Sequence, residues 1–303
     1  MKTTSITAIL SLTILFNSCS VSKQASQQYV SKAYTEINSF TAGAEGPGVD
    51  RDGILYAVNF AKEGTVGKIT KTGAGTIFLE LPNKSVGNGI RFNSKGEMLI
   101  ADYTNHNILK VDMATKQIST YANEPSMSQP NDIAITSKDR LFASDPNWAG
   151  GTGRIWTIST DGKVSLLEKN MGTTNGIEVS PDDKTLYVNE SVQRKVWAYD
   201  LADDGTLSNK RLLIEFPDFG MDGMRCDVAG NLYIARWGKG TVAKVSPRGE
   251  LLKEIVLLGK KPSNIAFGGN DGKTVFVTLQ DAGNIEAFQV EKPGREWKMM
   301  RRK

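Results

Sequence analysis

A unit whose start recurs every 42 to 47 residues appears six times along this chain, and the repeat restricts its fold more than any other feature. Each unit starts with a polar residue, passes through a turn containing Gly or Asp, and continues into a segment of β-forming residues. No stretch has a sustained helical period. The polar residues that open the units are called the heads here: Glu45, Asn88, Asn131, Asn175, Asp222 and Asn264.

Four short strands per unit, at a period of roughly 40 to 45 residues, are typical of a β-propeller. The strand after the turn is clear in every unit, over residues 54–58, 97–101, 140–144, 185–189, 231–235 and 274–278. The sequence therefore predicts an all-β fold, a six-bladed β-propeller with four-stranded blades around a central channel. We expect residues 34–40 to pair with the last unit, because that closes the ring without an open sheet edge.

The first 18 residues have the parts of an export signal. Lys2 supplies the positive charge, residues 6–16 the apolar run, and Ser18 the small residue before Cys19. The run is too short to span a membrane. It resembles a bacterial lipoprotein signal, which predicts export to the cell envelope and a lipid anchor on Cys19 as the only membrane contact. The alternative is a cleaved signal followed by an incidental cysteine.

Residues 19–33 are rich in Ser, Gln and Lys, which predicts a flexible tether and leaves 34–303 for the propeller domain. If Cys19 carries lipid, Cys226 alone remains and the domain has no internal disulfide. We expect Cys226 to be a small buried side chain rather than a reactive thiol. The net charge of +4 comes from 37 basic and 33 acidic side chains spread along the chain, so no nucleic-acid partner is predicted.

The heads would open the innermost strands of a propeller and converge at one end of its channel. Two of them, Glu45 and Asp222, are carboxylates that repel each other unless a cation or a proton lies between them. Carboxylate and amide oxygens suit a hard divalent ion, so we predict one cation, Ca²⁺ first, with Zn²⁺, Mg²⁺ and Mn²⁺ as alternatives. A zinc site of nitrogen and sulfur ligands is excluded, since it would have only His106 and Cys226.

A simpler interpretation is that the heads are turn formers, because Asn-Gly and Asp-Gly pairs are common in tight turns. Two observations favour the cation site instead. The heads occupy one position of the repeat, and Glu45 is a poor turn former. Catalysis by a serine nucleophile is not supported, because the single histidine cannot be assigned as the base of any serine.

Short motifs around the heads carry a family resemblance over about residues 40–290. They are Glu45-Gly46-Pro47, Gln129-Pro130-Asn131-Asp132, the run Thr174-Asn175-Gly176-Ile177-Glu178-Val179-Ser180-Pro181-Asp182, Met221-Asp222-Gly223-Met224 and Asn264-Ile265-Ala266-Phe267-Gly268-Gly269. As an ordered set they resemble the SMP-30/gluconolactonase family. The resemblance implies a six-bladed propeller hydrolase that uses one divalent cation, usually Ca²⁺, to open sugar lactones.

The resemblance also implies roles for the heads. Glu45, Asn175 and Asp222 would ligate the cation, and Asn131 would ligate it directly or through water, or hold the substrate. Asp132 would contact substrate hydroxyls. In the expected mechanism the cation polarises the lactone carbonyl and holds the attacking water. Asp222 then takes the proton of that water as the general base, with Asp132 as the reserve candidate.

Three further residues are expected to contact the substrate: Asn88, Gln129 and Trp148. Gln129 stands where animal members of the family carry Arg, so the particular lactone is left open. Trp148 belongs to the loop 145–151, and two interpretations stay open for it. Its side chain either forms a wall of the pocket or packs between blades.

Two other functions fit the same repeat. One is a propeller resembling NHL repeats that binds partners or acts as a scaffold without catalysis, which needs no cation between Glu45 and Asp222. The other keeps the cation but changes the substrate to an organophosphate, an aryl ester or a lipophilic lactone, as in the propeller phosphotriesterase and paraoxonase groups. A pocket rich in hydroxyl-binding side chains would argue against the second.

Overall fold

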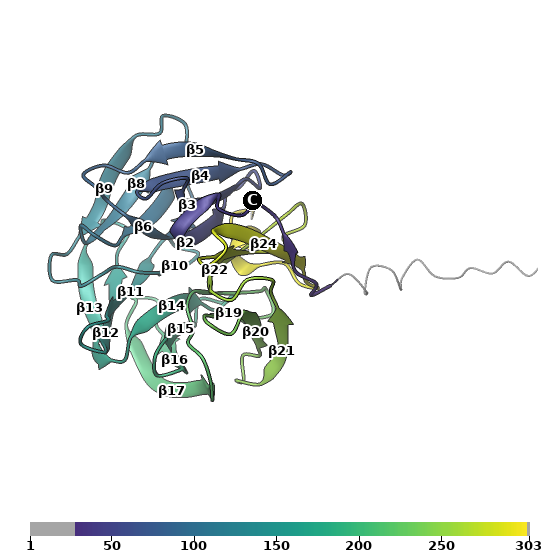
Figure 1. Ribbon diagram of the computed structural model, residues 1–303. Helices are drawn as coiled ribbons and strands as arrows, with labels where there is room; N and C mark the ends of the chain where they lie inside the picture. The colour runs from purple at the N-terminus through teal and green to yellow at the C-terminus, as the bar shows by residue number, and fades with distance from the viewer. Residues whose placement is uncertain (1–27, 302–303) are drawn as a thin grey trace, which may run out of the picture.

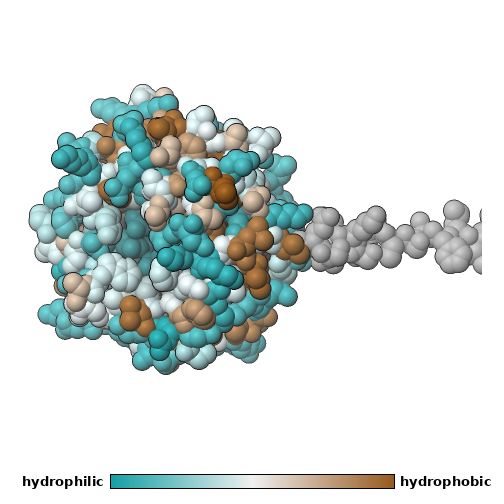
Figure 2. All heavy atoms as spheres, viewed as in Figure 1, coloured by the Kyte–Doolittle hydropathy of each residue, from teal (hydrophilic) through white to brown (hydrophobic). Residues whose placement is uncertain are grey.

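The computed structural model describes residues 28–301. Six four-stranded antiparallel sheets stand in a ring, with the first blade next to the last (Figure 1). The predicted six-bladed propeller is confirmed. The export signal and the anchor residue Cys19 lie outside the described residues. On the face drawn in Figure 2, hydrophobic residues form small separate groups among hydrophilic ones.

Each of the first five blades is a simple up-and-down sheet, because its four strands follow one another in the chain and adjacent strands pair. The first blade contains β2 (Phe40–Val49), β3 (Leu55–Phe60), β4 (Thr65–Ile69) and β5 (Gly75–Glu80). The second contains β6 (Gly87–Phe92), β7 (Met98–Asp102), β8 (Asn107–Val111) and β9 (Ile118–Asn123). The third contains β10 (Ile133–Ile135), β11 (Leu141–Asn147), β12 (Thr152–Ile158) and β13 (Val164–Met171).

The last three blades follow the same order, except that the sixth takes its outermost strand from the beginning of the chain. The fourth contains β14 (Thr174–Val179), β15 (Thr185–Glu190), β16 (Lys195–Leu201) and β17 (Leu207–Glu215). The fifth contains β18 (Met224–Cys226), β19 (Leu232–Arg236), β20 (Thr241–Val245) and β21 (Leu251–Val256). The sixth contains β22 (Pro262–Gly268), β23 (Thr274–Leu279), β24 (Asn284–Gln289) and β1 (Lys32–Ala33), and the helix α2 (Arg295–Met299) follows it.

The ring closes where β1 pairs with β24, in the register Lys32 to Ala287 and Ala33 to Glu286. We expected residues 34–40 to make this pairing, and the closing strand lies two residues earlier. The reason is that Phe40 already begins β2, the innermost strand of the first blade. Within the segment predicted as a tether, the Tyr29 amide donates to Gln289 O (2.9 Å) on the last blade.

The hydrophobic core lies between neighbouring blades rather than at the centre of the ring. One buried cluster joins Val58 of the first blade to Ile100 of the second, and another joins Phe276 of the sixth to Leu55 of the first. Strands in a blade alternate their side chains between two faces, so every blade contributes to two such clusters. The channel is therefore left to polar residues.

Two expectations about single elements can be compared with this fold. Cys226 is buried in β18, and burial raises the pKa of its thiol well above the ordinary value, as expected for a structural cysteine. Among residues 28–301 no helix is long and apolar enough to cross a membrane.

Tyr34 tests the closure of the ring, because its side chain joins the sixth blade to the first. Its ring packs on Phe276 (4.8 Å between centroids) and its hydroxyl donates to Thr70 O (3.0 Å). We expect Tyr34→Ala to lower the free energy of unfolding by about 2 to 3 kcal/mol. Urea unfolding followed by circular dichroism measures this, with Ile37→Ala as the exposed control. Equal stability of the two variants would show that the seam does not limit unfolding.

Candidate functional site

Five of the six heads line one cavity at an end of the central channel. Its volume is about 620 Å³, and its walls include Glu45, Asn88, Asn131, Asn175 and Asp222. All five are at most 9% exposed. The sixth head, Asn264, lies behind Glu45 and donates from its Nδ2 to the Glu45 Oε2 atom (3.1 Å). The predicted convergence of the heads is confirmed.

The glycines after the heads permit this convergence by letting neighbouring inner strands touch. A Cβ on Gly176 would lie 2.6 Å from Asp222 O, and one on Gly46 only 1.8 Å from Asn88 O. Gly46 has the positive φ of +49°, whereas Gly176 lies inside β14 without one. An Asn-Gly hairpin turn would need that left-handed conformation. The alternative interpretation of Asn175-Gly176 as a turn is therefore wrong.

Hydrogen bonds between blades fix the backbone of the heads. The Gly89 amide donates to Asn131 O (2.9 Å), and the Gly223 amide donates to Ser263 O (2.7 Å). The side-chain Nδ2 of Asn189 donates to Asp222 O (2.6 Å). Each bond joins one blade to the next, so the positions of the head side chains depend on the whole ring. Such rigid support is what a binding site requires.

The electrostatics of the cavity favour a bound cation. Burial raises the pKa of Glu45 to about 7, and the charge of Asp132 adds to this. Burial also raises the pKa of Asp222 well above its usual range, and the neighbouring charge of Glu45 raises it further. Both shifts mean that a negative charge at either residue lacks a sufficient positive partner.

Unpaired oxygens in the same cavity point to the same conclusion. The Oδ1 atoms of Asn88, Asn131 and Asn175 are buried and have no hydrogen-bond partner in the structure. Buried polar atoms without partners are rare, and each one calls for a ligand or water. Two carboxylates and three amide oxygens form a set of hard oxygen donors, which fits Ca²⁺ or a similar divalent ion. Within the described chain, no group of three or more His, Cys, Asp or Glu side chains could hold a metal, so the amides would have to complete the shell.

Asp132 does not lie where we expected it. It is fully buried and is not among the residues that line the cavity. Its Oδ2 atom accepts from Arg225 Nη1 (2.9 Å) and its Oδ1 atom accepts from Arg91 Nη1 (3.4 Å). Both oxygens of Asp132 are engaged with guanidinium groups beneath the cavity, so the carboxylate is not presented to a ligand there. Asp132 instead supports the floor of the cavity.

The channel below the cavity is filled by charged side chains that sequence reasoning missed. Three of them stand at the third position after a head: Arg91, Glu178 and Arg225. All three are at most 3% exposed. A charge recurring at one repeat position, in strands otherwise apolar, is the signal that could have found them.

Helix α2 lies at the other end of these charged side chains. We call the whole set the buried charge stack: Arg91, Asp132, Glu178, Arg225, Arg295 and Glu296. Glu296 forms an ion pair with Arg91. Arg295 donates from Nε to Ser180 O (3.0 Å) and from Nη2 to Asp183 Oδ1 (2.5 Å), while its Nη1 lies 3.8 Å from Glu178 Oε1. The channel is therefore a plugged core rather than a pore. Our sequence reading did not predict this helix, whose five residues are too few to show a helical period.

The two remaining predicted contacts have different outcomes. Trp148 lines the cavity with 42% of its side chain exposed, which decides between the two interpretations in favour of a pocket wall. Gln129 is not among the lining residues, and its backbone amide donates to Asp145 Oδ1 (2.7 Å). The structure therefore gives Gln129 no direct contact with a ligand in this cavity.

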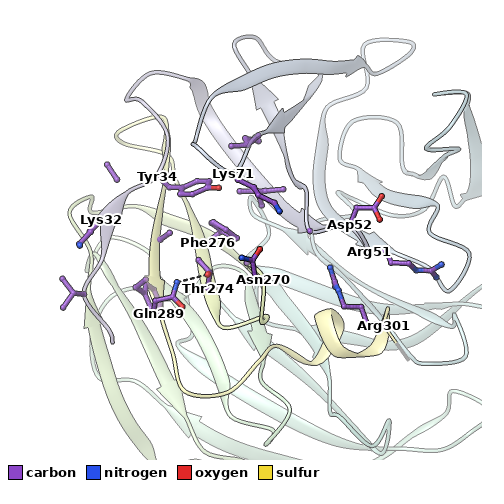
Figure 3. Close-up of a pocket in the computed structure, with 18 residues that line it drawn as sticks. Lys32, Tyr34, Arg51, Asp52, Lys71, Asn270, Thr274, Phe276, Gln289 and Arg301 are labelled. Atoms are coloured by element: carbon purple, nitrogen blue, oxygen red, sulfur yellow. Dashed lines mark hydrogen bonds between the residues drawn. The ribbon is translucent and has the colours of Figure 1, made fainter. Parts of the chain in front are cut away.

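A second, larger cavity of about 710 Å³ lies at the seam between the sixth and first blades. Figure 3 shows Lys32, Tyr34, Lys71 and Arg301 around it. Its arginines are already bonded to the protein: Arg51, for example, donates to Ser94 O (2.8 Å). Among the described residues that line it, Asp52 is the single carboxylate, so no pair like Glu45 and Asp222 is found there. Size alone therefore does not identify the functional site, and the channel mouth remains the candidate.

Fold and site together define a six-bladed propeller with an oxygen-rich cation-type site at the mouth of a plugged channel. The sequence matches the SMP-30/Gluconolactonase/LRE-like region over residues 43–281. The chain belongs to this family, as its motifs predicted.

Individual relatives were compared over different lengths. The chain is 29% identical to a gluconolactonase of Zymomonas mobilis over 220 residues, which cover 63% of this chain and 60% of that protein. It is 26% identical to a diisopropyl-fluorophosphatase of Loligo vulgaris over 298 residues, 87% of this chain and 94% of that one. The crystal structure of a calcium-binding protein, regucalcin, from Agrobacterium tumefaciens superposes with a TM-score of 0.75 at 23% identity, covering 86% and 95% of the two chains.

The buried stack makes a prediction about pH. Burial raises the pKa of Glu178 to about 7, and Glu296 raises it further, while Arg91, Arg295 and Arg225 oppose the shift. An acid with a higher pKa in the folded chain stabilises the fold below its unfolded pKa, and that contribution is lost as the pH rises through about 7. We therefore expect the difference in free energy of unfolding between Glu178→Gln and the parent to change by about 2 kcal/mol in favour of the variant from pH 5 to pH 8.

Urea unfolding at both pH values measures the change, with the exposed Glu215→Gln as the matched control. A stability difference that is the same at pH 5 and pH 8 would show that Glu178 stays ionised within the stack.

Proposed function

We propose that this protein is a divalent-cation-dependent hydrolase that opens lactones. The observation that carries the proposal is the set of two carboxylates with raised pKa values and three unpaired amide oxygens in one cavity. The name of the Zymomonas relative supports a lactone as the substrate, and sugar lactones are the first class to test. The calcium-binding regucalcin of the same fold supports Ca²⁺ as the ion to add first.

The residues that would hold the cation are Glu45, Asn131, Asn175 and Asp222, because their oxygens lack sufficient partners within the protein. When bound, a divalent cation polarises a carbonyl and stabilises the charge that forms on its oxygen. Without a cation the two carboxylates would repel each other unless a proton lay between them, and a purely binding propeller does not need such a pair.

The side chains of the protein supply the rest of the reaction. A carboxylate oxygen of Asp222 accepts the proton of the attacking water while the new C–O bond forms. The ring C–O bond then breaks, and the leaving alkoxide takes that proton back. Asn88 can donate from its amide to orient the lactone at the floor of the cavity. The fixed backbones of the heads keep these groups in place between turnovers.

We also propose that the protein is exported and held in the cell envelope by a lipid on Cys19. The support is the signal-like sequence before this residue. The described chain joins the propeller at the outer edge of the sixth blade, where the Tyr29 amide donates to Gln289 O. These contacts lie away from the channel mouth, so they leave it open.

Variants of the two carboxylate heads test the cation site and the general base. We expect Asp222→Asn to lower lactone turnover at least about 100-fold, because the variant loses both its charge and its proton acceptor. Glu45→Gln should abolish the rise in melting temperature that Ca²⁺ causes, since it removes half of the negative charge. Turnover is followed by acid release from a panel of aldonolactones, after EDTA treatment and again after Ca²⁺ is restored.

The control is Asp203→Asn, whose side chain lies on the surface and pairs with Lys184. It should keep both the turnover and the thermal shift of the parent. Full turnover by Asp222→Asn with Ca²⁺ present would refute its role as base, and no Ca²⁺-dependent shift in the parent would favour a non-catalytic propeller.

A further inference from the structure

The upper part of the cavity differs chemically from its floor. Four apolar side chains line it while staying largely exposed: Trp148 (42%), Val192 (60%), Phe219 (51%) and Trp237 (39%). We call these four residues the aromatic rim. The heads beneath them are nearly inaccessible, so the exposure of the side chains increases from a polar floor to an apolar mouth.

The rim concentrates a kind of residue that is rare elsewhere on the surface. In residues 28–301, the large exposed hydrophobic side chains outside this cavity are Val, Leu and Ile, whereas the exposed Trp and Phe side chains all line it. Single exposed aliphatic residues are ordinary, but apolar side chains gathered around one concavity mark a ligand site.

The protein holds the rim in place by specific contacts. Trp237 donates from Nε1 to Gln280 Oε1 (2.9 Å), and Lys261 Nζ lies 5.1 Å from the centre of its ring. Trp148 sits in a turn in which the Gly151 amide donates to Trp148 O (3.3 Å). The Trp237 side chain, fixed in this way, loses little conformational freedom when a ligand binds.

Phe219 is held at a cost to its own backbone. Its φ is +45°, a conformation that a bulky residue rarely adopts. The fully buried Arg236 stabilises this loop by donating to Asp218 Oδ1 (2.8 Å) on one side and to Gly220 O (3.5 Å) on the other. Backbone strain that the surroundings maintain is typical of functional sites. In this loop the strained backbone places the Phe219 ring in the wall of the cavity.

Several polar side chains around the mouth are already bonded within the protein, which makes them less available to a sugar. Asn59 donates to Gly43 O (2.7 Å) and accepts from the Gly64 amide (3.0 Å). Gln280 Oε1 accepts from Trp237, and Ser191 donates to Met221 O. A hydroxyl that loses water against these bonded groups finds no replacement hydrogen bond from them, which disfavours its binding at that part of the wall.

We propose that the aromatic rim makes the site select lactones that carry an apolar substituent on the ring, over polyhydroxylated ones. The inference rests on the proposed lactone hydrolysis and specifies its substrate class. The lactone carbonyl enters toward the heads, and the alkyl or aryl substituent packs against Trp148, Phe219 and Trp237. The higher affinity for a substituted lactone comes from the apolar area that its substituent removes from water. The groups that carry out the reaction stay the same.

Three six-membered lactones test this with the full-length protein and Ca²⁺: δ-valerolactone, its pentyl-substituted form δ-decalactone, and glucono-δ-lactone. We expect kcat/KM for δ-decalactone to exceed that for each of the others by about tenfold or more. Trp148→Ala and Phe219→Ala should each reduce the ratio of kcat/KM for δ-decalactone to that for δ-valerolactone about three- to tenfold, mainly through a higher KM for δ-decalactone.

Leu252→Ala is the matched control, because Leu252 is an exposed apolar residue on β21 outside the cavity. It should leave the ratio unchanged, and thermal unfolding verifies that all variants fold. A higher kcat/KM for glucono-δ-lactone, or a ratio that neither rim variant alters, would overturn the inference. Hydrolysis of none of the three, nor of the aldonolactone panel, would instead reject the proposed lactonase.

Discussion

The placement of Glu45 and Asp222 in one small buried cavity is the constraint on which this structure depends. One belongs to the first blade and the other to the fifth, and the charge of Arg225, which lowers the pKa of Glu45, does not offset the effect of burial there. Burial raises both pKa values, the charge of Asp132 raises each of them further, and the charge of Glu45 also raises that of Asp222. The arrangement costs free energy unless something positive is bound, and proteins keep such costs where function needs them.

The rest of the ring holds that arrangement in place. Glycines after the heads allow the inner strands to approach, and hydrogen bonds such as that from Gly223 to Ser263 connect each blade to the next. The β1–β24 pairing prevents the ring from opening at its seam. Because the cation-type site draws on the first to fifth blades, it exists only when the ring is closed.

Beneath the cavity, charged side chains that pair with one another occupy the channel. Arg91 and Arg225 neutralise Asp132, and Arg295 and Glu296 of α2 close the stack from the far end. Replacing one member of such a buried set leaves an unpaired charge, which is far more destabilising than loss of a surface ion pair. The stack therefore keeps one arrangement and gives the heads a rigid base. Above them, the aromatic rim gives the same cavity an apolar entrance.

The sequence by itself determined the fold class, the number of blades and the heads. These depend on a repeat, and a repeat is visible without coordinates: Glu45, Asn175 and Asp222 occupy one position in it. It also placed Trp148 near the site but could not decide which way the side chain faces.

Only the tertiary structure decided which residues meet across blades, because such contacts join positions that have no fixed separation in the chain. The family resemblance implied that Asp132 contacts the substrate, yet Arg91 and Arg225, each from another blade, hold it in the channel core. The left-handed Phe219 depends on its clamp by Arg236. The plug by α2 arises because residues near the end of the chain reach Glu178 in the fourth blade. Local sequence thus specifies the strands and their heads, and closure of the ring decides what surrounds them.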